Sequence, residues 1–76
     1  MSSALRLVPN TRTEPITNAE TVRIGRWIHQ STGCATNYPP DLVEVRVVGR
    51  TDPLPGALVE KIESVIGPFD QVPMPD

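Results

Sequence analysis

Apolar residues follow two different periods along the chain, and both are clearest in its second half. Over residues 42–48 (LVEVRVV), valines alternate with Glu44 and Arg46, which predicts a strand with one buried face and one partly solvated face. After a turn rich in proline, apolar residues recur at helical spacing, at Leu58, Val59, Ile62, Val65 and Ile66. Gly67 and Pro68 end this amphipathic helix. The other segments are expected to pack around this strand, turn and helix.

The first half of the chain contains one clear helix signal. Thr17 and Glu20 have the spacing of a capping box, in which each side chain accepts a hydrogen bond from the backbone amide of the other residue. The predicted helix runs from there to about residue 31 or 32, and Gly33 suits the left-handed position after its last turn. Gly25 costs this helix about 1 kcal/mol relative to alanine, so we expect a neighbouring element to approach it closely.

The remaining segments give weaker signals. Residues 2–8 alternate loosely, with Leu5 and Leu7 on one face, and form either a short strand or a loose terminus. Residues 9–16 and 33–41 are polar and interrupted by prolines, so we expect them to be loops.

Together these elements predict a small α+β fold, in the order weak strand, helix, strand, helix. A two- to three-stranded sheet would be packed by the two helices, with a partner completing the sheet. If residues 2–8 form a strand, the long connection to residues 42–48 allows a right-handed parallel crossover. The chain is expected to be a single domain over residues 1–76, with residues 1–4 and 70–76 flexible.

The length of 76 residues limits the hydrophobic core. A chain of this size gains only about 3–5 kcal/mol from its core and usually needs a disulfide, a metal or a partner. Cys34 and His29 are the single residues of their types, so one chain can form neither a disulfide nor a closed Cys/His metal site. An open edge of the strand at 42–48, or the face of the last helix, would then bind a partner. We therefore expect a homodimer or a complex with a larger protein.

The formal net charge of −2 is too small to indicate a partner by itself. Residues 1–38 carry four arginines against two glutamates, whereas residues 39–76 carry three basic residues against seven acidic ones. Such halves can attract each other within a fold or across a dimer, although chance also explains the division. No apolar run reaches the roughly 18–20 residues of a membrane span, and the first residues are too polar for a signal peptide. We expect a cytoplasmic protein without a membrane partner.

Arginines dominate the candidate binding residues. Arg23, Arg26 and Gln30 share the solvated face of the first predicted helix, where they could contact phosphates or pair with the carboxylates of a protein partner. The mild overall charge favours the protein partner over nucleic acid, which stays possible. The full set of candidates is Arg12, Arg23, Arg26, Trp27, Gln30, Arg46 and Arg50.

Candidate chemistry is sparse. His29 and Cys34 lie five residues apart near the end of the first helix and could form a nucleophile–base pair, but no group that would orient them is recognisable. Arg50 belongs to the segment GRTDPLPG before the second helix, which lacks the lysine and serine or threonine of a phosphate-binding loop. We therefore predict no catalytic residues, no metal site and no cofactor.

The leading interpretation is a non-enzymatic protein–protein interaction module, a small accessory, regulatory or inhibitory protein that acts on a larger protein assembly. The alternative is a small nucleic-acid-binding protein that uses the arginine face of the first helix. A third interpretation is a small oligomeric enzyme that uses Cys34 and His29.

Overall fold

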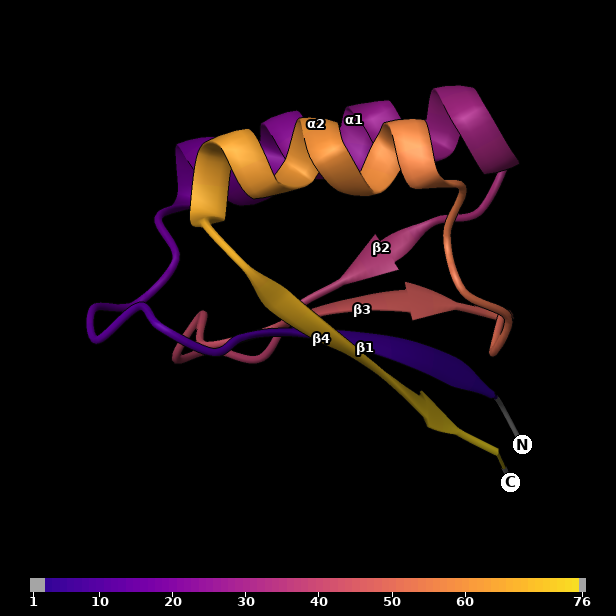
Figure 1. Ribbon diagram of the computed structural model, residues 1–76. Coiled ribbons are helices and arrows are strands. Elements are labelled where there is room, and N and C mark those ends of the chain that lie inside the picture. The colour runs from indigo at the N-terminus through magenta and orange to yellow at the C-terminus, as the bar shows by residue number, and fades with distance from the viewer. Residues whose placement is uncertain (1–2, 76) are drawn as a thin grey trace.

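The computed structural model describes residues 3–75, which form one sheet and two helices. Both helices lie on one face of the sheet (Figure 1). The sheet has the strand order β2-β3-β1-β4, and every neighbouring pair is antiparallel. This βαββαβ connectivity is that of ferredoxin-like folds, which carry many unrelated functions. The elements are β1 (Ala4–Pro9), α1 (Asn18–Thr32), β2 (Thr36–Asn37), β3 (Val45–Val48), α2 (Gly56–Ile66) and β4 (Phe69–Met74).

Helix α1 begins and ends where its local sequence predicts. The amide of Glu20 donates to Thr17 Oγ1 at 3.2 Å, and the amide of Thr17 donates to Glu20 Oε1 at 2.9 Å, so the capping box is confirmed. Gly33 follows the helix with a φ of 76°, a left-handed conformation that glycine adopts without strain.

Gly25 lets β2 approach α1, as its position inside a helix predicts. A Cβ atom at this position would lie 2.6 Å from Thr36 Oγ1, which is closer than any normal contact. Any larger residue in this turn of α1 would therefore require the side chain of Thr36, the first residue of β2, to shift.

The hydrophobic core lies between the helices and the sheet. Leu5 and Leu7 of β1 are fully buried, which confirms the weak strand at the start of the chain and the face that its alternation assigns. Buried residues of β3 and the apolar faces of α1 and α2 form one core with these two leucines. The buried apolar residues are Leu5, Leu7, Ile16, Ile24, Ile28, Val45, Val47, Leu54, Leu58, Ile62, Ile66 and Phe69.

The α+β class is confirmed, but the sheet has four strands rather than two to three. Residues 70–74, expected in a flexible tail, belong to β4 and pair with β1. Pro73 hides this strand in the sequence, and it is tolerated because β4 is an edge strand with one unpaired side. The short β2 was expected to be loop. Of the other residues expected to be flexible, 1, 2 and 76 lie outside the described residues.

Strand β3 is an interior strand, which corrects two expectations. It pairs with β1 on one side and β2 on the other, so it offers no open edge to a partner. Its pairing with β1 is antiparallel, so the parallel crossover is also wrong. The apolar stripe of α2 is covered within the chain, since Leu58, Ile62 and Ile66 are buried. A partner would therefore have to contact a surface other than the edge of β3 or the apolar side of α2.

Within residues 3–75, neither helix has both the length and the apolar composition needed to cross a membrane.

Candidate functional site

The candidate functional site is the face of the sheet opposite the helices. Side chains alternate along a strand, so the neighbours of the buried residues point away from the core. Neither helix covers this side of the sheet (Figure 1). We call it the open face, and it carries Ala4, Arg6, Val8, Asn37, Arg46, Val48, Asp70, Val72 and Met74.

Three large apolar side chains on the open face are exposed to solvent. Val48 is 40% exposed, Val72 39% and Met74 41%. Ala4 lies between Val48 and Met74, because β1 pairs with β3 and with β4 at that position. Exposed apolar side chains gathered next to charged groups are typical of surfaces that bind another molecule.

Three charged residues, which we call the arginine–glutamate cluster, occupy the middle of the open face. Arg6 lies opposite Arg46 in the pairing of β1 with β3, and both bind the carboxylate of Glu44, directly before β3. Arg6 donates to Oε2 from Nε at 2.8 Å and also from Nη2, while Arg46 donates from Nε to Oε1 at 2.8 Å. Glu44 is only 4% exposed, although its strand pattern placed it on a partly solvated face. Both arginines lie against its carboxylate.

The electrostatics of the cluster favour the charged forms. Burial alone would raise the pKa of Glu44, but the hydrogen bonds from Arg6 and Arg46, together with their charges, outweigh burial and lower it. The hydrogen bond to Glu44 and its negative charge raise the pKa of Arg6. The ion pair of Arg6 and Glu44 therefore stabilises the charged form of both residues.

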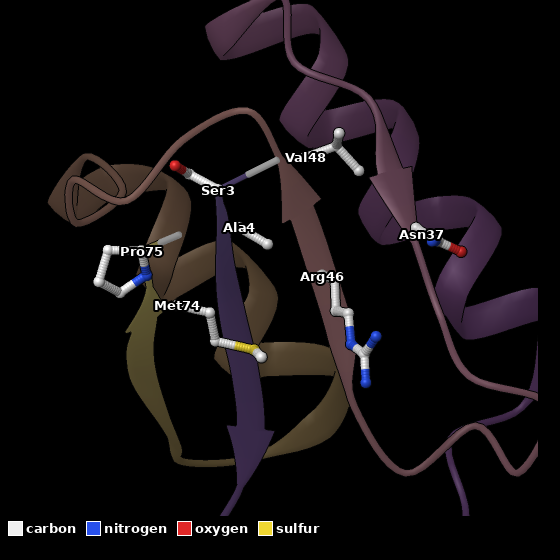
Figure 2. A pocket seen from close by; sticks show the side chains of 7 residues that line it. All are labelled: Ser3, Ala4, Asn37, Arg46, Val48, Met74 and Pro75. Carbon is white, nitrogen blue, oxygen red and sulfur yellow. The ribbon is translucent and has the colours of Figure 1, made fainter. Parts of the chain in front are cut away.

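Two hollows of about 290 Å³ each flank the cluster. One is lined by Arg46 together with Val48 and Met74 (Figure 2). The other lies toward the end of β1 and is lined by Arg6 and Val8 among others. The open face thus presents hollows of mixed polar and apolar lining on both sides of the arginine–glutamate cluster.

Arg46 is the one predicted binding residue on the open face. Arg12 instead holds the loop before α1: it donates to Glu20 Oε1 at 2.7 Å and Oε2 at 3.0 Å, and to the backbone oxygens of Glu14 and Pro15. These hydrogen bonds from Arg12, followed by that from the Thr17 amide, lower the pKa of Glu20 to about 2.

Arg50 also serves its own loop, where it donates to the backbone oxygens of Asp52 and Pro53 at 3.0 and 2.8 Å. Arg12 and Arg50 therefore each stabilise the loop that precedes a helix.

The helix candidates lie on the other side of the molecule. Arg23, Arg26 and Gln30 are exposed on α1, so the shared solvated face of the first helix is present. Arg23 and Arg26 line a hollow around Val22, which is 54% exposed. Trp27 is half-buried and packs under the ammonium group of Lys61, 5.1 Å from the ring centre. The sheet and α1 itself separate these residues from Arg46.

Among the described residues, no hydrogen bond joins His29 to Cys34. His29 is exposed near the end of α1, and Cys34 is half-buried against the core with its Sγ 3.9 Å from the backbone oxygen of Thr32. Among residues 3–75, no group of three or more histidine, cysteine, aspartate or glutamate side chains could hold a metal ion.

Sequence reasoning missed most of the open face. Arg6 could have been found, because it alternates with Leu5 and Leu7 and must face the other way. Val72 and Met74 could not, because nothing in the polar, proline-containing end of the chain predicts a strand.

No protein-family model, no curated protein and no solved structure matches this chain. The proposals that follow therefore rest on the geometry of its own residues.

Proposed function

We propose that this protein is a non-enzymatic interaction module that binds a partner protein through the open face. The observation that supports it is the exposure of Val48, Val72 and Met74 around an arginine pair that is fixed by a buried carboxylate. Apolar burial would supply affinity, and the fixed charges would select the partner and its orientation. In this proposal the protein is a small accessory or regulatory component of a larger assembly.

The size of the open face favours a transient complex. Its longest strands have six residues and the sheet has four strands, which at about 3.4 Å per residue and 4.8 Å per strand gives roughly 400 Å² at most. Two copies stacked face to face would bury on the order of 800 Å² in total, below the 1,200–2,000 Å² of a stable interface. A different partner can also contact the loops around the face and so bury more.

The charges on the open face also argue against the homodimer that the sequence predicts. A two-fold axis through the centre of the open face sets the middle of one face against the middle of the other. Arg6 and Arg46 occupy that middle, so like charges would meet. The homodimer stays a prediction, and a distinct partner is the better-supported proposal.

Nucleic-acid binding by α1 is the second proposal, and it rests on the exposed pair Arg23 and Arg26. Arg12, which the sequence added to this set, is occupied by Glu20. The open face is no better suited to nucleic acid: it has no aromatic side chain for stacking, and as a whole it carries two negative charges, Glu44 beside the arginines and Asp70 at the far end of β1, against its two arginines.

A comparison of two exposed valines tests the main proposal. The tagged full-length protein, Val72→Lys and Val22→Lys serve as baits in cross-linked capture from extracts of the native host. Val72 lies on the open face and Val22 on α1, and both are exposed, so both variants should fold. We expect partner proteins to be captured by the wild type and by Val22→Lys, and to be lost with Val72→Lys.

The opposite pattern, with loss at Val22→Lys alone, would move the interface to α1 and contradict the proposal. Capture that neither variant changes, or none above a bait-free resin, would contradict it too. Nuclease treatment of the extract separates the two proposals, because a nucleic-acid bridge disappears with it. Fluorescence anisotropy with labelled duplex DNA and RNA at about 50 mM salt checks α1 directly.

A further inference from the structure

The hollow beside Arg46 combines a charged group with two exposed apolar side chains, Val48 and Met74, and the polar Ser3 and Asn37 complete its walls (Figure 2). It lies at the end of the sheet where β1 begins and has a volume of about 290 Å³. Arg46 is the one charged residue of its lining. The lining consists of Ser3, Ala4, Asn37, Arg46, Val48, Met74 and Pro75.

Arg46 is held in place with part of its hydrogen-bonding capacity unused. Its Nε donates to Glu44 Oε1, which fixes the plane of the guanidinium group. Among the described residues, neither Nη1 nor Nη2 of Arg46 donates a hydrogen bond, and the side chain is 41% exposed. Two parallel terminal N–H groups on a fixed arginine match the two oxygens of a carboxylate.

The surrounding charge also favours an anion. Arg6 and Arg46 share the single carboxylate of Glu44, so the arginine–glutamate cluster keeps one unbalanced positive charge. Asp70 does not balance it at the hollow, because it pairs with Val8 at the far end of β1. A carboxylate bound to Arg46 would complete the neutralisation.

The walls of the hollow require an apolar group next to that carboxylate. Val48 lies on β3 beside Arg46, and Met74 faces it across Ala4 of β1. Val48 and Met74 are both substantially exposed, so an aliphatic or aromatic side chain placed between them would remove apolar surface from water.

We infer that this hollow binds a segment of a partner protein in which an aspartate or glutamate lies beside an aliphatic or aromatic side chain. The carboxylate pairs with the terminal nitrogens of Arg46, and the apolar side chain contacts Val48 and Met74. This inference rests on the proposed function, since it specifies the chemistry by which the open face recognises its partner. A free carboxylic acid offers the same groups, but these exposed walls would enclose little of it, which favours a protein segment.

An array of short immobilised peptides tests the inference with the labelled full-length protein. Each acidic–apolar peptide is printed beside its counterpart with glutamine or asparagine in place of the acid. We expect the acidic peptides to bind at least about tenfold more tightly, which is the usual worth of a charge-assisted pair. Arg46→Gln should reduce their binding to the level of the amide peptides.

Three further variants control for folding and geometry. Arg23→Gln removes an exposed arginine from α1 and should change nothing. Arg46→Lys keeps the positive charge but lacks the paired N–H groups of the guanidinium, so its binding of the acidic peptides should lie between that of the wild type and that of Arg46→Gln. Val48→Thr keeps the shape of a strand residue but loses a methyl group, so binding should weaken roughly two- to fourfold.

The inference would be overturned if acidic and amide peptides bound equally well, or if no peptide bound in an acid-dependent way. It would also be overturned if Arg46→Gln bound the acidic peptides as tightly as the wild type. Competition by free 4-methylpentanoate at peptide concentrations would overturn it in favour of a small-molecule site. In the capture experiment, loss of the partner with Val72→Lys but not with Arg46→Gln would refute this inference alone and leave the proposed function standing. Retention with both variants would refute both.

Discussion

Removing the two arginines around Glu44 should destabilise the protein more than removing the glutamate itself. Arg6→Gln/Arg46→Gln keeps hydrogen-bond donors near the carboxylate but leaves a negative charge in a site where its side chain is only 5% exposed. Glu44→Gln instead leaves two arginines whose side chains are 34% and 41% exposed, so water can hydrate them. The two losses of stability differ because Glu44 is buried and the arginines are not.

The expected magnitudes are large for so small a protein. An uncompensated buried charge costs about 3–5 kcal/mol, whereas Glu44→Gln should cost about 1–2 kcal/mol, the worth of its hydrogen bonds to partly hydrated groups. A chain of 76 residues has a free energy of unfolding of roughly 4–11 kcal/mol. The double variant therefore loses about a quarter or more of the total, and the triple variant with Arg6, Glu44 and Arg46 all replaced by Gln should recover most of it.

Urea unfolding of the four proteins at pH 7 and pH 3 measures these differences. In the wild type, Glu44 has a lowered pKa, so its contribution is present above its ordinary value of 4.5 and is lost as the pH falls through the lowered pKa. In the double variant, burial acts without the arginines and raises the pKa of Glu44. Acidification then relieves the buried charge, and the gap between the two proteins should narrow. Arg6→Gln alone, expected to cost about 1.5–3 kcal/mol, serves if the double variant is unfolded at pH 7.

Two results would refute this reasoning. The first is a Glu44→Gln protein less stable than the arginine variants, which would mean that repulsion between the arginines outweighs burial of the carboxylate. The second is a gap that stays constant or widens on acidification, which would mean that Glu44 is hydrated in the folded protein.

Three further predictions concern local contacts. Glu20→Gln should lower the free energy of unfolding by about 1–2 kcal/mol at pH 7. Because the pKa of Glu20 is held near 2, it should also flatten the loss of stability between about pH 5 and pH 2 in acid titrations followed by circular dichroism. Gly25→Ala should cost about 1–3 kcal/mol through its clash with Thr36 Oγ1, and adding Thr36→Ala should restore most of that in thermal unfolding. Gln71→Ala should speed hydrogen exchange of the Leu54 amide, which donates to Gln71 Oε1 at 2.7 Å, while Gln71→Glu keeps the acceptor and should not.

Local signals account for the parts of the fold that the sequence predicts well. The capping box of α1 involves residues three apart, and the stripe of α2 needs only helical spacing. The close approach at Gly25 was also readable, because a glycine inside a helix needs a reason. The capping box and the stripe depend on neighbours at helical spacing, so no knowledge of the rest of the chain is required, whereas the identity of the element that approaches Gly25 came only from the structure.

The candidate site was readable only in part. Arg46 was identified from the strand pattern, but its partner Arg6 and its neighbour Met74 come from strands that were weak or absent in the sequence pattern. Arg12 and Arg50 were expected to bind other molecules because arginine is versatile, whereas both hold backbone carbonyls of their own loops. Sequence shows that an arginine is present, but its free or occupied state depends on contacts that form on folding.

By itself, the sequence determined the two helices, the capping box of α1, the α+β class and the buried faces of β1 and β3. The predicted strand over residues 42–48 was too long, because β3 begins at Val45 and Val43, expected on the buried face, is 49% exposed. Only the tertiary structure decided that β4 joins the sheet, that β3 is interior, and that one sheet face is left without a helix. The physical reason is separation along the chain. Glu44 is paired because Arg6, 38 residues away, lies beside it, and β4 is a strand because β1, at the other end of the chain, supplies its hydrogen bonds.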